Sequence, residues 1–171
     1  AASQGRDFYW LRDRIPPGCH AVLTDVTSGW SVLSVMGPQS RALLQPLSAD
    51  DFSNEAFPFG TSREIDLGYA RVRATRISYV GELGWELYVP TEFVPGVFDV
   101  ILEAGPAHGL HLAGYHALNS LRIEKGYRHW GHDITDENTP LEAGLGFAVK
   151  WEKPDGFVGR EALEERRNAP L

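Results

Sequence analysis

The segment at residues 76–90, RISYVGELGWELYVP, limits the fold of this chain more than any other stretch. Gly81 and Gly84 separate two runs rich in β-branched and aromatic residues, which predicts two strand ends joined by a tight connection. Side chains of a strand point to its two faces in turn, so the second run has one apolar and one polar face. The apolar face, which predicts a core on that side, carries Trp85, Leu87 and Val89.

The polar face of the second run carries Glu86 and Tyr88, and Tyr79 ends the first run. An aromatic ring and a carboxylate can therefore converge across the short connection. Because a carboxylate only accepts hydrogen bonds, the ligand that suits this pair is a planar ring with adjacent N–H donors. The alternative for this segment taken alone is a plain tight turn, with Glu86 solvated and Tyr79 half-buried in the sheet.

Composition and charge exclude several classes of partner. The chain has 171 residues, enough for one domain with a real core or for a large piece of a larger domain. Its formal net charge of -7 argues against a broad basic surface for nucleic acid. No apolar run reaches the length of a membrane span, and no secretory signal pattern opens the chain. We therefore expect neither nucleic acid nor a membrane among its partners.

Cys19 is the single cysteine, so the chain forms no internal disulfide and has no multi-cysteine zinc site. This usage suits a reducing compartment or one indifferent to redox, and we expect Cys19 to be a structural residue. A Cys19–His20 nucleophile is disfavoured because adjacent residues of an extended segment point to opposite faces.

Hydrophobic periodicity and turn residues predict the order of helices and strands. We expect helices at residues 4–15, 39–47, 91–108, 115–125 and 160–167. We expect strands at residues 20–26, 30–36, 61–67, 69–79, 84–89 and 147–151. Hairpins followed by helices, without regular strand–helix alternation, indicate an α+β fold with antiparallel sheets and helices packed on one face.

Several details of these elements are open to test. Thr91 is the predicted N-cap of its helix. The helix at 115–125 is expected to direct Leu118, Leu121 and Ile123 inward. The loop at 48–62 is expected to be pinned by its three phenylalanines, Phe52, Phe57 and Phe59.

The chain lacks the short motifs of a nucleophile elbow, a zinc protease, a phosphate loop or a dinucleotide fold. His129, His132 and Asp133 have side chains of the metal-binding type, but they stand in a loop without a fixed scaffold, so local hydrogen bonding is favoured and no metal is expected. Arg122 and Arg128 are basic candidates for a ligand contact, although Arg122 also suits the C-terminal end of a helix dipole.

Four blocks of sequence together carry a family resemblance, namely residues 79–90 (YVGELGWELYVP), 119–131 (NSLRIEKGYRHWG), 139–147 (TPLEAGLGF) and 157–163 (FVGREAL). In order and spacing they resemble the folate-dependent aminomethyltransferase family, the glycine cleavage T-protein family. Within it, the chain resembles in particular the C-terminal folate-binding region of sarcosine and dimethylglycine dehydrogenases. The resemblance spans nearly the whole chain and implies a partial aminomethyltransferase folate-binding fold.

The resemblance implies a role for five residues as binding residues for tetrahydrofolate. Tyr79 is expected to pack on the pterin ring, Glu86 to accept its donors, and Leu87 and Tyr88 to line the same pocket. Phe147 stands where dimethylglycine dehydrogenases have a ligand-contacting tyrosine, so one hydroxyl contact is lost while ring packing can remain.

The resemblance also implies what this chain does not contain. The family's catalytic aspartate lies in an N-terminal portion without counterpart here, and the FAD-binding domain and the C-terminal barrel are missing. We therefore expect a fragment of a multidomain parent with no catalytic residue of its own, inactive when isolated. Residues 1–60 are expected to be the remainder of a first subdomain and residues 61–171 a second subdomain.

The leading hypothesis is a domain that captures, in its parent, the one-carbon unit from oxidative N-demethylation of sarcosine or dimethylglycine as 5,10-methylenetetrahydrofolate. The alternatives are a non-catalytic regulatory or interaction module of the same fold, and a trimmed glycine-cleavage aminomethyltransferase. The expected partners are the folate and the rest of the parent chain, and uncovered strand edges favour self-association of the fragment. The expected location is the bacterial cytoplasm, or the mitochondrial matrix in a eukaryote.

Overall fold

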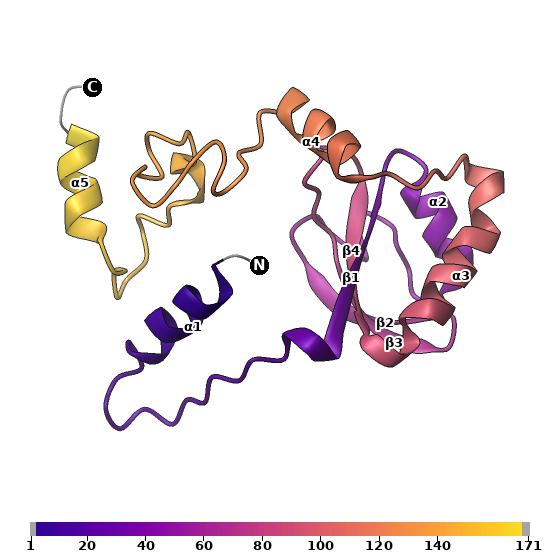
Figure 1. The fold of residues 1–171 in the computed structure, drawn as a ribbon, viewed down its shortest axis with the longest axis horizontal. Helices are drawn as coiled ribbons and strands as arrows, with labels where there is room; N and C mark the ends of the chain where they lie inside the picture. The colour runs from indigo at the N-terminus through magenta and orange to yellow at the C-terminus, as the bar shows by residue number, and fades with distance from the viewer. Residues whose placement is uncertain (1–2, 169–171) are drawn as a thin grey trace. The chain divides into compact units, whose positions relative to one another are not determined.

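The computed structural model describes residues 3–168 and is shown in Figure 1. Contacts divide the described residues into two units. Residues 3–78 and 82–112 form the first unit, and residues 79–81 together with 113–168 form the second unit. The predicted boundary at residue 60 falls inside the first unit. The assignment of residues 1–60 and 61–171 to subdomains of a larger fold stays a prediction.

A four-stranded antiparallel sheet forms the centre of the first unit (Figure 1). Its strands are β1 (Trp30–Met36), β2 (Ser62–Leu67), β3 (Ala70–Thr75) and β4 (Gly84–Pro90), in the order β1-β4-β3-β2. Two helices, α2 (Ser40–Leu44) and α3 (Val94–Ala104), lie against one face of this sheet. The expected α+β class, with antiparallel strands and helices on one face, is confirmed.

Alternation along the strands produces the core between the sheet and these helices. Trp85, Leu87 and Val89 of β4 are all 0% exposed, as the sequence pattern predicts. Phe52 packs edge-on against Trp85, with ring centroids 5.1 Å apart. Val97 and Ile101 of α3 complete the cover, because a helix can bury one apolar stripe on a sheet face.

The loop at residues 48–62 is pinned by two of its three phenylalanines. Phe52 and Phe57 are 0% exposed, whereas Phe59 is 73% exposed. The prediction is therefore wrong for Phe59. Arg41 fixes the loop from α2, because its Nε donates a 2.7 Å hydrogen bond to the carbonyl of Phe52.

Two predicted helices of the first unit are interrupted at prolines. The helix expected at 91–108 is divided into η3 (Thr91–Phe93), α3 and η4 (Gly105–His108), and η2 (Gln45–Leu47) follows α2 directly. Prolines occupy the first turns of α3, η2 and η4, where a missing N–H costs nothing. Thr91 is not a capping residue, since its hydroxyl donates to the carbonyl of Ser28 at 3.0 Å.

The beginning of the chain differs from the prediction. Helix α1 (Gln4–Arg12) is shorter than the expected helix at 4–15. Residues 20–26 are not a strand, and Val22 is 93% exposed. A segment of strand-like composition becomes a strand only when a neighbour pairs with it, and no strand among residues 3–168 does so. Cys19 is exposed and not a packed structural residue.

The second unit consists of two helices and long loops. They are α4 (Tyr115–Glu124) and α5 (Arg160–Asn168), with a short helix η5 (Gly146–Ala148) between them. The strand predicted at 147–151 is wrong, because the backbone there bonds to itself over two or three residues, as in the Val149 N–H to the carbonyl of Gly146. On α4 the expected apolar face is wrong for Leu121 and Ile123, whereas Leu118 is half-buried. Leu121 and Ile123 are 41% and 58% exposed, and Arg122 is the buried residue at 1%.

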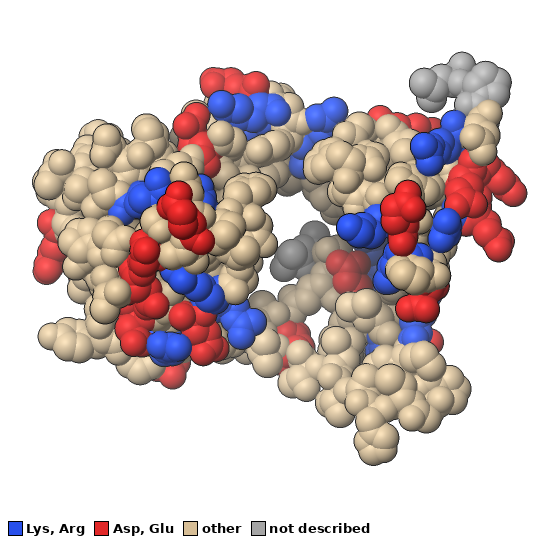
Figure 2. All heavy atoms as spheres, turned by 180° about the vertical axis from the view of Figure 1, so that it is seen from behind, with Lys and Arg blue, Asp and Glu red and all other residues tan. Residues whose placement is uncertain are grey.

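Two further features of the described residues are their surface charge and the length of their helices. Figure 2 shows acidic and basic side chains interspersed on the face in view, which suits the net charge of -7. Among residues 3–168, no helix combines the length and the apolar character needed to cross a bilayer.

Candidate functional site

The face of the sheet opposite α2 and α3, here called the outer face, carries the polar side chains of the central strands. Tyr88 of β4 is paired with Val32 of β1 on one side and with Arg73 of β3 on the other. In the next row of this face, Glu86 is paired with Ser34 and Thr75. Register therefore sets Glu86 and Tyr88 side by side at the middle of the outer face.

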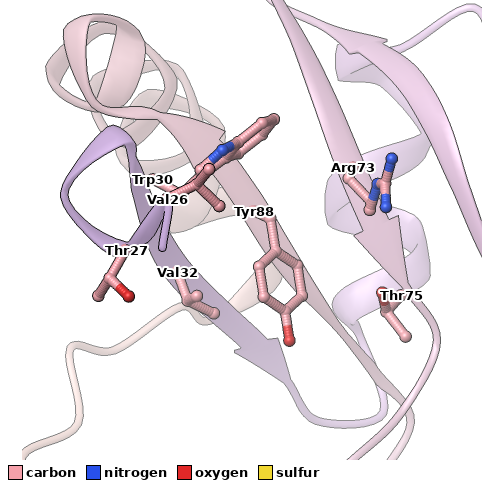
Figure 3. A pocket seen from close by; sticks show the side chains of 7 residues that line it. All are labelled: Val26, Thr27, Trp30, Val32, Arg73, Thr75 and Tyr88. Atoms are coloured by element: carbon pink, nitrogen blue, oxygen red, sulfur yellow. The ribbon is translucent and has the colours of Figure 1, made fainter. Parts of the chain in front are cut away.

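A concavity of about 600 Å³ lies on the outer face. Figure 3 shows the seven side chains that line it, contributed by β1, β3, β4 and the turn before β1: Val26, Thr27, Trp30, Val32, Arg73, Thr75 and Tyr88. Its volume falls in the range of about 300–1,000 Å³ that small-molecule sites occupy. Apolar walls with a few polar groups suit a flat, partly apolar ligand.

Glu86 and Tyr88 form a hydrogen-bonded pair beside this concavity. The Tyr88 hydroxyl donates to Glu86 Oε2 at 2.9 Å. Burial, and then the hydrogen bond to the Glu86 carboxylate, raises the pKa of Tyr88 above its ordinary value, so the hydroxyl keeps its proton. Within residues 3–168, Glu86 Oε1 accepts no hydrogen bond. One oxygen of the carboxylate is thus oriented by Tyr88 while the other is available to a ligand.

Leu87 lies on the opposite side of β4. Its side chain is 0% exposed and belongs to the apolar core beneath the sheet. The structure therefore does not bring the Leu87 side chain together with Glu86 and Tyr88. Alternation along a strand already requires this separation, since neighbouring residues point to opposite faces.

Tyr79 and Phe147 belong to the second unit. The Tyr79 hydroxyl donates to the carbonyl of Arg128 at 3.0 Å, and its ring stacks on Tyr127 with centroids 6.1 Å apart. Phe147 lies in η5 and is 87% exposed. Because Tyr79 and Glu86 are in different units, their convergence on one ligand stays a prediction.

A buried arginine organises the second unit. Arg122 of α4 donates from Nε and Nη2 to Asn119 Oδ1, at 2.9 and 2.6 Å. Its Nη1 donates to the carbonyl of Tyr127 at 2.8 Å and to Asp133 Oδ2. From the sequence, Arg122 was expected only to contact a ligand or to interact with the helix dipole. The signal that could have found this network is an arginine four residues before the glycine that ends the helix, followed by a loop with an acidic residue.

The carboxylate of Asp133 also accepts bonds from the two histidines of its loop. The backbone N–H of His129 and Nδ1 of His132 approach it at 2.9 and 3.0 Å. These bonds, together with the Arg122 guanidinium, hold the pKa of Asp133 well below its usual range. His129 and His132 therefore bond locally, as the sequence favours, and no cluster of three metal-ligating side chains is found within residues 3–168.

Comparison with known proteins connects this fold to a family. The GCVT N-terminal domain model matches residues 1–153. Human mitochondrial sarcosine dehydrogenase is 49% identical over 149 residues, which are 87% of this chain and 16% of that protein. Human mitochondrial dimethylglycine dehydrogenase is 39% identical over 166 residues, which are 96% of this chain and 19% of that protein. The chain thus spans less than a fifth of these relatives.

A solved structure shares the fold. The heterotetrameric sarcosine oxidase from Corynebacterium sp. U-96, in complex with pyrrole 2-carboxylate, superposes with a TM-score of 0.52 at 19% identity. The match covers 63% of this chain and 53% of that chain, and at this identity it concerns the fold alone. The family model covers most of the sequence, and the dehydrogenases agree with it. This chain belongs to the GCVT N-terminal domain family.

Proposed function

We propose that this chain is a tetrahydrofolate-binding domain of a longer amine-oxidising enzyme. In that enzyme it captures the one-carbon unit from oxidative N-demethylation of sarcosine or dimethylglycine as 5,10-methylenetetrahydrofolate. The observation that carries the proposal is the Glu86 carboxylate on the outer face, oriented by Tyr88 and open at Oε1. The names of the two dehydrogenases support the choice of amine.

Glu86 is proposed to receive the donors of the pterin ring. A pterin presents a ring N–H and an exocyclic amine side by side, and a carboxylate accepts such a pair. Tyr88 limits the rotation of the carboxylate through its 2.9 Å hydrogen bond. Hydrogen bonds to a charged acceptor are about twice as strong as neutral ones, so this contact dominates the orientation of the ring.

The concavity beside Glu86 is proposed to hold the ring and the aryl group attached to it. Trp30 and Val32 supply apolar wall, and Thr75 and Arg73 supply polar groups. Nη2 of Arg73 lies 3.6 Å from Glu64 Oε1, so part of its charge is already balanced within the sheet. The outer face therefore suits a flat ring better than a strongly anionic tail.

Tyr79 and Phe147 are proposed to pack against the ring from the second unit. Leu87 is proposed to support the site from beneath, because its buried side chain fixes the strand that carries Glu86 and Tyr88. Bound tetrahydrofolate supplies the nucleophilic amine that accepts the one-carbon unit. The residues of this chain bind and orient it, and amine oxidation is assigned to an FAD site elsewhere in the parent.

Calorimetric titration of the full-length parent enzyme with tetrahydrofolate tests this function. Glu86→Gln is expected to weaken the affinity about 10- to 100-fold, because a hydrogen bond to a charged group is replaced by a neutral one. Glu103→Gln is the matched control, since Glu103 is exposed on α3 at the other face of the sheet. An enzyme that does not bind tetrahydrofolate, or that binds equally well with Glu86→Gln, would contradict the proposal and favour an interaction module.

A further inference from the structure

We propose that Arg122 and Asp133 are positioning residues for the ring of Tyr79. This inference rests on the proposed function, in which Tyr79 contacts the folate. Neither residue is proposed to touch the ligand. They act by fixing the loop at residues 127–133, which supplies both groups that contact Tyr79.

Arg122 is buried and hydrogen-bonded to three partners. The residue is 1% exposed, and its guanidinium bonds to Asn119 on the same helix, to the carbonyl of Tyr127 at the start of the loop, and to Asp133 at its end. A planar guanidinium with several donors can hold such partners in one fixed arrangement. Arg122 thus joins the two ends of the loop to α4.

Asp133 closes the loop through the hydrogen bonds of its carboxylate. Its carboxylate accepts bonds from Arg122, from the backbone of His129 and from the ring of His132. The backbone of the loop also folds on itself, since the Gly131 N–H donates to the carbonyl of Ile134 at 2.7 Å. The Arg122 side chain of this pair is 2% exposed and the Asp133 side chain is 28% exposed, and the additional hydrogen bonds hold the loop in one conformation.

The loop contacts Tyr79 through two of its residues. Tyr127 forms the stacking partner of the Tyr79 ring, with an angle of 18° between the planes. Its neighbour Arg128 accepts the Tyr79 hydrogen bond through the backbone carbonyl. The carbonyl of Tyr127 is itself bonded to Arg122. One peptide segment therefore transmits the position set by Arg122 and Asp133 to both contacts of Tyr79.

A double-mutant cycle in the full-length parent enzyme tests this inference. The dissociation constant of tetrahydrofolate is measured for wild type, Asp133→Asn, Tyr79→Ala and the combination. Asp133→Asn is expected to weaken binding about 10-fold in the wild-type background and to have no further effect when Tyr79 is absent. In Asp133→Asn, amine oxidation with an artificial electron acceptor is expected to be unchanged, which separates a positioning effect from loss of folding.

A conservative variant gives a second test. Arg122→Lys keeps the charge but loses the planar fork, so it is expected to weaken tetrahydrofolate binding in the same Tyr79-dependent way. Arg166→Lys, on exposed α5 of the same unit, is the matched control and is expected to bind as wild type.

Two results would overturn the positioning role while leaving the proposed function intact. One is unchanged affinity in both Asp133→Asn and Arg122→Lys, with Glu86→Gln still weakened. The other is a loss of affinity that is as large without Tyr79 as with it. An enzyme in which wild type itself fails to bind tetrahydrofolate would instead refute the proposed function.

Discussion

The two units of this chain are stabilised in different ways. The first unit has an apolar core in which fifteen residues, Trp85 and Leu87 among them, form one buried cluster. The second unit is built around a buried arginine, and its loops are held by hydrogen bonds to Arg122 and Asp133. The two kinds of stabilisation therefore suit two different roles. Apolar packing provides a rigid sheet for Glu86, and a polar network sets the shape of the loop around Tyr79.

The largest expected effect is a loss of stability in the first unit, caused by a change in its apolar core. Trp85→Ala removes a fully buried indole from the core and is expected to destabilise the chain by about 3–5 kcal/mol. Trp30→Ala is the matched control, because Trp30 is 40% exposed on the outer face. Chemical denaturation followed by circular dichroism measures both. Equal losses for the two variants would show that the core does not dominate the first unit.

Low pH is expected to destabilise the second unit more than the first unit. Because the pKa of Asp133 is lowered in the folded chain, its contribution to stability is complete above the ordinary aspartate pKa of about 3.9 and is lost as the pH falls through the lowered value. Limited digestion by pepsin between about pH 4 and pH 2 should therefore begin to cut residues 113–168 while the sheet remains protected.

Asp133→Asn supplies the comparison for the acid experiment. The variant is expected to be cut in the second unit already at the upper end of that pH range, because its side chain carries no charge to lose. Uniform cutting of both units at every pH would contradict the assignment of acid sensitivity to Asp133.

The smallest expected effect is a change in the pKa of Tyr88, on the outer face of the first unit. The outer face also carries a polar contact, from Tyr88 to Glu86. Glu86→Gln removes the carboxylate charge but not the burial, so the raised pKa of Tyr88 is expected to fall part of the way toward its ordinary value of about 10. Spectrophotometric titration of the tyrosines measures the shift. Glu64→Gln, on β2 of the same face, is the control and should leave the titration unchanged.

The sequence pattern alone predicted those elements whose limits and buried face depend on neighbouring residues in the chain. The bounds of β1 and the alternation of buried and exposed residues along β4 were predictable, because a strand with one buried face has a period of two. The end of helix α4 was predictable from Gly126, the glycine that follows it. Alternation also identified Glu86 and Tyr88 as neighbours on the polar face, with Tyr79 at the end of the preceding run. The family resemblance added Leu87 and Phe147 to the candidate binding residues, which periodicity could not identify.

The other features depend on contacts that no local pattern identifies, and these could not be predicted. Residues 20–26 and 147–151 have strand-like composition, but a strand also needs a partner, and the sequence does not say which one is present. Arg122 was missed as a buried residue because burial of a charge depends on partners that lie five and eleven residues further along the chain. The loop that unites them has no periodic pattern.

The most direct test of the central claim, that Glu86 accepts the donors of a pterin ring, compares two ligands. Tetrahydrofolate and its 2-desamino analogue are titrated into the full-length parent enzyme and into its Glu86→Gln variant. We predict that wild type prefers tetrahydrofolate about 10- to 100-fold and that the variant loses most of this preference. An equal preference in both proteins would contradict the claim, because the exocyclic amine would then bind elsewhere.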